Sequence, residues 1–303
     1  MTPWPRPLQR GDRVQLAAAS SALAAAAAAR LEAGMAVLSG WGLEVQPHPD
    51  PLRHWGYLAG RDAQRRADLH PQAPLVACLR GGWGAARLLE EDAHAGATAA
   101  GAPHWLLGFS DVTSLLWARQ AAGISGGIHG PMVTTLAAEP AWSQERLRQL
   151  LFGQPLPALT GDSWSPGVAE GPLLVGNLTV ATHLLGTPHL PDLRGAVLVL
   201  EDIGEAPYRL DRMLTHWRLS GALQQLAGLG FGRFSNCEAE ADANNEPGDA
   251  VTVEQVLRER SADLGIPVLG ALPVGHGPGN GALPLGRRAR LDATRGRLDL
   301  LEP

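Results

Sequence analysis

Four segments of the chain combine polar side chains with glycine, and each follows a short apolar run. They are Arg80-Gly-Gly-Trp-Gly84, Gly108-Phe-Ser-Asp111, Glu201-Asp-Ile-Gly-Glu205 and Gly275-His-Gly277. In an open α/β sheet, the carboxyl ends of the strands line the ligand crevice. A serine, a carboxylate and a histidine at such ends suit acyl transfer, in which they act as nucleophile, orienting acid and base. Ser110, Glu201 and His276 lie far apart in the sequence, so only the fold can bring them together.

Ser110 is the strongest candidate nucleophile. Gly108 permits a tight turn out of a strand, and Ser110 with Asp111 opens an amphipathic helix. A hydroxyl at that position lies in the positive field of the helix N-terminus, which favours a developing anion. Serine is also a preferred N-cap residue, so a purely structural role stays open. Val112 excludes a G-x-S-x-G nucleophile elbow.

Gly81, Gly82 and Gly84 follow the apolar run 75–79. Their backbone N–H groups could form half of an oxyanion hole or cradle a phosphate. Equally, the glycines could only turn the chain into the next helix. Their spacing does not fit the dinucleotide fingerprint G-x-G-x-x-G. The sequence therefore predicts no nucleotide cofactor.

Glu201 and His276 are candidates for the acid and the base. Glu201 closes the apolar run 197–200, but an ion pair with Arg209 or Arg212 would explain it as well. Glu205 is the competing carboxylate. His276 stands between two glycines and has little steric cover, although a lone histidine is more often structural. The histidines show no H-E-x-x-H pattern, so no metal site is predicted.

The composition excludes several classes of function. All 25 basic residues are arginine, which rules out Schiff-base catalysis, a P-loop lysine and a Ser–Lys dyad. A net charge of −5 without a basic run argues against nucleic acid or an anionic membrane as a partner. The two cysteines suggest a reducing compartment. Neither a signal peptide nor a run of roughly 18 apolar residues is visible, so we expect a cytoplasmic protein.

The pattern of elements predicts two domains of an α/β protein. Strands and helices alternate over residues 13–135, which favours a doubly wound parallel sheet in a domain of residues 1–152. Residues 153–171 are rich in Pro, Gly and Ser and are expected to form a linker. Residues 172–303 are expected to form a smaller mixed domain. Within it, the acidic stretch 238–248 is interpreted as an exposed loop.

Seven blocks in order resemble the LD-carboxypeptidase family, the serine peptidase family that also contains the microcin C immunity peptidases. The blocks lie at residues 56–62, 79–89, 108–115, 129–132, 176–179 and 200–214, and at the end of the chain at 275–280 with 283–286, and so extend along nearly the whole chain. The resemblance implies a Rossmann-like N-terminal domain and a smaller β-rich C-terminal domain. It implies Ser110 as nucleophile, Glu201 as triad acid and His276 as base. It also implies an oxyanion hole made by the backbone N–H of Asp111 and of Gly81 or Gly82.

The same resemblance implies the reaction and the partner. The expected activity is release of the terminal D-Ala from a murein tetrapeptide by a homodimer that needs no cofactor. Arg80 is a candidate anchor for the substrate carboxylate, although an inter-domain ion pair is equally open. Trp83 is also a candidate for substrate binding. Trp83 and Phe109 stand where the family usually has tyrosines, which puts any hydrogen bond from those hydroxyls in doubt.

Two other functions stay open. The first is an immunity-type peptidase that cleaves a peptidyl-nucleotide antibiotic; such relatives tend to be longer. The second is a small-molecule binder without catalysis, which the presence of all three triad residues disfavours.

Overall fold

The chain is divided into two compact units. The computed structural model describes residues 2–90, 103–238 and 251–301. Unit 1 comprises Met1–Pro157, Gly186–Pro191 and Pro278–Gly286, and unit 2 comprises Ala158–Leu185, Asp192–Gly277 and Arg287–Pro303. Most of the acidic loop expected at 238–248 lies outside the described residues. The stretch expected as a linker, 153–171, contains two short strands and the start of a third.

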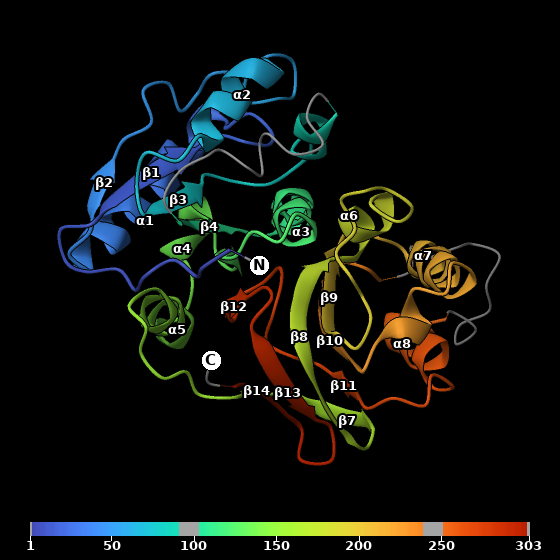
Figure 1. Ribbon diagram of the computed structural model, residues 1–303. Helices are drawn as coiled ribbons and strands as arrows, with labels where there is room; N and C mark the ends of the chain where they lie inside the picture. The colour runs from blue at the N-terminus through green and yellow to red at the C-terminus, as the bar shows by residue number, and fades with distance from the viewer. Residues whose placement is uncertain (1, 91–102, 239–250, 302–303) are drawn as a thin grey trace. The chain divides into compact units, whose positions relative to one another are not determined.

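Unit 1 is built on a six-stranded sheet (Figure 1). Its strands are β1 (Arg13–Ala17), β2 (Glu44–Gln46), β3 (Leu75–Cys78), β4 (Trp105–Gly108), β5 (Gly127–His129) and β12 (Leu283–Pro284). Their order is β12-β5-β4-β3-β1-β2, and only β12 runs antiparallel to its neighbour. The chain reverses its direction of travel across the sheet between β1 and β3. Ligands of doubly wound sheets bind at such a switch point, so the loops after β1 and β3 are the expected site.

Helices flank the strands of unit 1. They are α1 (Ala28–Gly40), α2 (Asp62–Leu69), α3 (Thr113–Ala121), α4 (Val133–Leu136) and α5 (Ala141–Leu151), with single 3₁₀ turns at Ala25–Ala27, Ala86–Leu89 and Ser110–Val112. Every residue of β3 and β4 is buried, as expected for central parallel strands that are covered on both faces. The core runs through these strands and includes Trp105 and Ile128. The six-alanine run enters the first 3₁₀ turn and α1, because alanine is the best helix former.

Unit 2 contains an eight-stranded sheet that curls back on itself. The strands are β6 (Leu159–Thr160), β7 (Asp162–Ser165), β8 (Val168–Asn177), β9 (Val197–Ile203), β10 (Gly228–Ser235), β11 (Val268–Gly270), β13 (Arg288–Asp292) and β14 (Arg297–Leu300). Their order is β6-β14-β13-β8-β9-β10-β11-β7. Only Gly161 separates β6 from β7 in the chain, yet these strands stand at opposite ends of that order. The two edges therefore meet, and the sheet is barrel-like.

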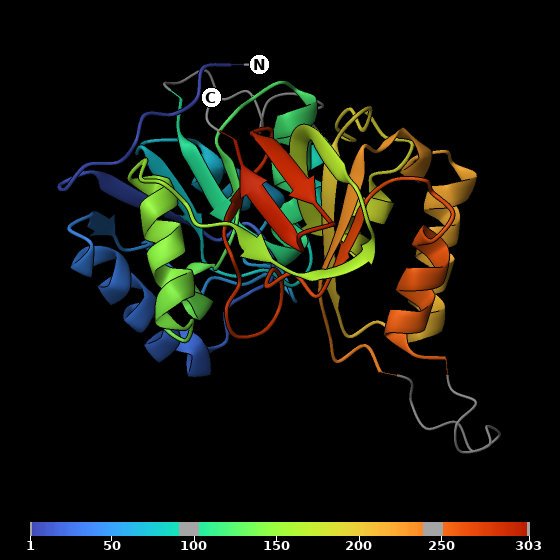
Figure 2. The same cartoon turned by 90° about the horizontal axis from the view of Figure 1, so that it is seen from below.

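The middle of this sheet is parallel. Strands β8, β9, β10 and β11 are neighbours in chain order, and the helices α6 (Leu178–His183), α7 (Pro207–Leu219) and α8 (Val253–Ser261) connect them. Right-handed crossovers that all advance in one direction place their helices on one face. Figure 2 shows α7 and α8, in orange, side by side on that face. The expected α/β architecture, with a parallel sheet first and a β-rich part second, is confirmed.

Within the described residues, no helix combines the length and the apolarity needed to cross a bilayer.

Candidate active site

Ser110 occupies a strained position two residues after the end of β4. Phe109 is extended, and Ser110 then turns the chain with a φ of +60° into a 3₁₀ turn that leads into α3. Positive φ is uncommon for residues other than glycine and costs on the order of 1–3 kcal/mol, which surrounding structure must offset. An N-cap residue instead takes an extended φ. Ser110 is therefore not the N-cap of this turn; Phe109 holds that position. Ser110 is half-buried and lies near the carboxyl end of a central strand.

The backbone of Gly81 lies against Ser110. A Cβ added to Gly81 would stand 3.0 Å from the Ser110 Cβ and 3.2 Å from its Oγ. Gly81 is not among the residues with positive φ, so the close approach, rather than the backbone conformation, explains the glycine. The structure thus brings the first glycine of the loop to the candidate nucleophile.

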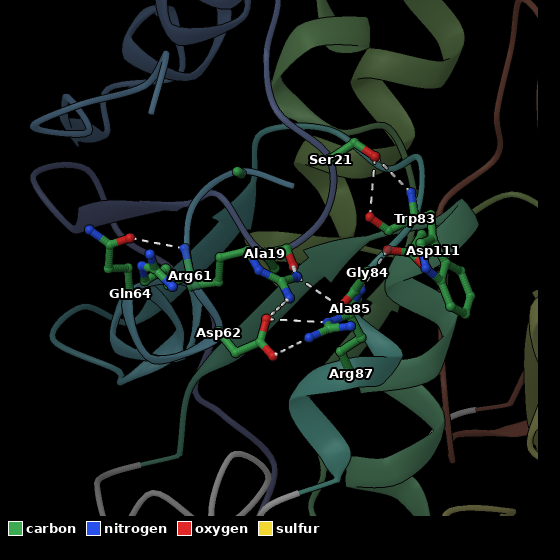
Figure 3. A network of polar contacts seen from close by, with 12 residues as sticks. Ala19, Ser21, Arg61, Asp62, Gln64, Trp83, Gly84, Ala85, Arg87 and Asp111 are labelled. Carbon is green, nitrogen blue, oxygen red and sulfur yellow. Dashed lines mark hydrogen bonds and ion pairs between the residues drawn. The ribbon is translucent and has the colours of Figure 1, made fainter. Parts of the chain in front are cut away.

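Ser21 and Arg80 hold the outer side of this glycine loop. The Ser21 Oγ accepts the N–H of Trp83 at 2.9 Å and donates to the Trp83 carbonyl at 3.2 Å (Figure 3). Arg80 donates its Nε to the Gly81 carbonyl at 3.1 Å and its Nη1 to the Ala22 carbonyl at 2.9 Å. Arg80 therefore braces the loop. Trp83 is 40% exposed, and both residues stay candidates for substrate contact.

Asp111 links the nucleophile turn to the end of the glycine loop. Its carboxylate is fully buried, and Oδ2 accepts the N–H of Ala85 at 2.8 Å (Figure 3). Burial raises the pKa of Asp111, while the Ala85 N–H, the Ser20 hydroxyl and the Gly84 N–H favour its ionised form. Asp111, whose N–H is the expected oxyanion donor, thus contacts the glycine loop through its side chain.

A buried arginine completes this side of the loop. Arg65 of α2 has no exposed surface and donates Nη1 to the carbonyls of Ala19, at 2.6 Å, and Gly84, at 2.7 Å. Its Nη2 donates to Asp62 at 2.6 Å. The sequence reasoning missed Arg65. A signal was present, because Arg65 stands four residues before the buried Leu69 and so shares its helix face.

Glu201 and His276 form a hydrogen-bonded dyad in unit 2. The Oε2 of Glu201 accepts the His276 N–H at 3.1 Å and the ring Nδ1 at 2.7 Å. The Glu201 side chain, within β9, is wholly buried, whereas the His276 side chain is 16% exposed. A carboxylate on Nδ1 selects the tautomer whose Nε2 accepts a proton. The dyad has the geometry of an orienting acid and a base.

Gly275 makes room for the dyad. Its φ is +102°, and a Cβ there would stand 2.5 Å from the Glu201 Oε2. On the other side of the histidine, Ser235 donates its hydroxyl to the His276 carbonyl. The chain after β11 is thereby held against the ends of β9 and β10.

Glu205, the competing acid, has a different partner. Its carboxylate lies 3.5 Å from Arg209, one turn later on the chain, and Arg212 stacks over the ring of Tyr208. Arg209 and Arg212, the expected ion-pair partners of Glu201, thus contact Glu205 and Tyr208 instead.

A second carboxylate orders the strand ends beside Glu201. Asp202 accepts hydrogen bonds from the Asn177 side chain, the Thr179 N–H and hydroxyl, and the Ile203 N–H, at 2.8–2.9 Å. Burial, together with the neighbouring charge of Glu201, raises the pKa of Asp202 to about 6 against these hydrogen bonds. Asn177 also caps α6. The ends of β8 and β9 are therefore locked together at the level of Glu201.

The predicted site residues fall into two groups. Ser110, Asp111, Gly81 and Gly82 belong to unit 1, whereas Glu201 and His276 belong to unit 2. Across the described residues there is no group of three or more His, Cys, Asp or Glu that could hold a metal ion. Both groups contain parts that acyl transfer requires. The group in unit 1 combines a hydroxyl with backbone N–H donors, and the group in unit 2 combines an acid with a base.

Comparisons with known proteins find two domains of one carboxypeptidase family in the chain. Residues 14–130 match the LD-carboxypeptidase N-terminal domain, and residues 170–291 match the LD-carboxypeptidase C-terminal domain. A putative carboxypeptidase of Synechocystis sp. is 48% identical over 98% of this chain and 97% of its own length. The murein tetrapeptide carboxypeptidase of Pseudomonas aeruginosa is 35% identical over 93% and 94%. The microcin C7 self immunity protein in complex with aspartyl sulfamoyl adenosine shares the fold, with a TM-score of 0.85, 20% identity and coverage of 100% and 99%.

The two family domains are matched in the expected order. A relative is also 48% identical over almost the full length. The chain belongs to the LD-carboxypeptidase family of peptidases.

Proposed function

We propose that this protein is a serine LD-carboxypeptidase that releases the terminal D-Ala from murein tetrapeptides. The observation that carries the proposal is the pair of hydrogen bonds from His276 to the buried Glu201. An acid that fixes a histidine in this way prepares it to act as a base for a hydroxyl. Ser110, strained and partly exposed beside Gly81, is the hydroxyl that we assign to it.

The reaction proceeds in two balanced halves. Ser110 Oγ attacks the carbonyl carbon of the amide at the L-configured centre while His276 Nε2 takes the hydroxyl proton. The N–H of Asp111 and of Gly81 or Gly82 stabilise the tetrahedral oxyanion, each by roughly 3 kcal/mol if well aimed. His276 then gives its proton to the leaving amine of D-Ala as the C–N bond breaks. Water, deprotonated by His276, cleaves the acyl-Ser110 ester, and the proton returns to Ser110.

Glu201 acts through the histidine. It holds the ring orientation and stabilises the imidazolium that forms twice in each cycle. In this mechanism Glu201 keeps its own charge throughout.

The murein substrate is favoured over the peptidyl-nucleotide by the relatives. The murein tetrapeptide carboxypeptidase of Pseudomonas aeruginosa is 35% identical to this chain, whereas the microcin C7 self immunity protein, at 20%, shares only the fold. Arg80 and Trp83 are our candidates for contact with the substrate. Arginine is the only permanently positive side chain available to hold the substrate carboxylate, because the chain contains no lysine.

The experiment compares substrates and a nucleophile variant. Purified protein is incubated with a murein tetrapeptide or with a peptidyl-nucleotide, and released D-Ala and nucleotide are measured. We expect D-Ala release that is lost in Ser110→Ala. Activity that persists in Ser110→Ala would refute the nucleophile. Cleavage of the peptidyl-nucleotide alone would establish the immunity-type function, and binding without turnover would establish a non-catalytic binder.

A further inference from the structure

One peptide group at the end of the glycine loop is held at both of its ends. Its carbonyl oxygen, that of Gly84, accepts Arg65 Nη1 at 2.7 Å. Its N–H, that of Ala85, donates to Asp111 Oδ2 at 2.8 Å (Figure 3). Because the peptide group is planar, two hydrogen bonds at opposite ends fix the orientation of its plane. These two hydrogen bonds therefore fix the direction in which the chain leaves the glycine loop.

The two holding groups are themselves fixed. The Arg65 guanidinium also donates to the Ala19 carbonyl, after β1, and to Asp62 of its own helix. Asp111 follows Ser110 directly, so its carboxylate moves with the nucleophile turn. The loops after β1, β3 and β4 are thus joined through one peptide group. In a planar guanidinium the donors keep a rigid fork, which a lysine could not reproduce.

The burial of these charges indicates a role beyond packing. Arg65 and Asp111 have no exposed surface. A buried charge is costly unless it is paired, and apolar residues of similar volume often stabilise a fold as well or better. Buried side chains that hydrogen-bond to a loop do, however, restrict its motion, as Arg65 does through Nη1 and Asp111 through Oδ2. Such rigidity is what oxyanion donors require, since a misplacement of 1 Å can lower a rate about 100-fold.

We propose that the Arg65 and Asp111 side chains are positioning residues for the oxyanion hole. They clamp the Gly84–Ala85 peptide and so hold the glycine loop at a fixed distance from Ser110 and from the N–H of Asp111. Neither side chain touches the reacting atoms. The inference rests on the proposed function, because it assigns the loop its part in acyl transfer.

Arg65→Lys is the first test, and Arg87→Lys is its matched control. Arg87 contacts the same Asp62, at 3.0 Å, and its side chain is 34% exposed. We expect Arg65→Lys to lower kcat by about 10- to 100-fold with KM changed less than threefold, and Arg87→Lys to stay within twofold of wild type. Asp111→Ala, which removes the acceptor of the Ala85 N–H, should repeat the kcat loss. The double variant should lose little more than the worse single variant, because both act on one peptide group.

Two readouts separate positioning from a merely structural role. A substrate-like boronic acid forms a tetrahedral anion on the serine, so its Ki should rise in Arg65→Lys in proportion to the fall in kcat/KM. A structural role would lower the melting temperature and leave the ratio of Ki to KM unchanged. Hydrogen exchange of a peptide covering residues 81–89 should be faster in Arg65→Lys than in Arg87→Lys, whatever the activity.

The outcomes are distinct. A folded Arg65→Lys with the kcat and loop exchange of Arg87→Lys overturns the inference and leaves the proposed function intact. A wild-type protein that hydrolyses no tetrapeptide overturns the proposed function, and the hydrogen-exchange comparison then still decides whether the clamp holds the loop.

Discussion

The carboxylate of Glu201 receives both the backbone N–H and the ring Nδ1 of His276, at 3.1 Å and 2.7 Å. Replacement of the acid by its amide, Glu201→Gln, keeps the shape but supplies no charge and favours the wrong tautomer of the ring. We expect kcat to fall by about 10⁴, as loss of the acid does in serine triads. The fall in kcat is measured as steady-state release of D-Ala, and circular dichroism checks that the variant is folded.

Glu205→Gln is the control for that variant. Glu205 pairs with Arg209 at the surface, and such pairs contribute roughly 0–1 kcal/mol. Its kcat should stay close to wild type. A loss of activity in Glu205→Gln with an active Glu201→Gln would reverse the assignment of the acid.

Gly275→Ala should disable the dyad without a change in either catalytic side chain. The new methyl group would stand 2.5 Å from the Glu201 Oε2, at a φ of +102°. The carboxylate must then move, so kcat should fall by at least about 100-fold. Gly221→Ala is matched for backbone strain, because Gly221 has a φ of +73° and open space around it. It should lower the melting temperature by a few degrees and leave kcat intact. Equal kcat in the two variants would contradict the steric argument.

The local pattern of the sequence predicted the central strands and the residues that follow them. Continuous apolar runs become β3, β4 and β9, and Ser110 lies two residues after the end of β4 as expected. Strand β9 continues two residues beyond Glu201, to Ile203. These features depend on neighbours in the sequence, through strand periodicity and turn chemistry. Residue types and positions made Glu201 and His276 candidates, and the resemblance implied their roles, but no periodicity relates residues so far apart.

Other features depend on long-range partners that the sequence does not display. Residues 278–286 belong to unit 1, where Glu139 accepts the N–H groups of Gly279 and Asn280 and Arg146 donates to the Ala282 carbonyl. The Pro- and Gly-rich stretch at 153–171 forms β6 and β7 because it closes the edges of a curled sheet. Two- to four-residue strands of this kind have no periodicity of their own.

The ion pairs of Asp62 predict a pH dependence of stability. Hydrogen bonds from Arg87 and then Arg65 outweigh burial and lower the pKa of Asp62 from its usual 3.8. Folding therefore favours the ionised carboxylate, and its stabilisation is present above about pH 4 and lost as the pH falls through the lower folded value. Urea unfolding of wild type and Asp62→Asn at pH 7 to 2.5 measures this. The difference in unfolding free energy should shrink below pH 4; a difference constant over the whole range would contradict the linkage.

Gly81→Ala tests whether the glycine loop must touch Ser110. The added Cβ would stand 3.0 Å from the Ser110 Cβ and 3.2 Å from its Oγ, so either the loop or the nucleophile has to shift by a few tenths of an ångström. Gly81 lacks a positive φ, and therefore backbone strain contributes nothing to the effect. Loss of one oxyanion donor costs about 10²–10³ in kcat, and we expect a fall approaching 10² with KM nearly unchanged. Gly40→Ala, in open space at the end of α1, is the matched control and should retain wild-type kcat. If Gly81→Ala is as active as Gly40→Ala, the oxyanion donor lies elsewhere.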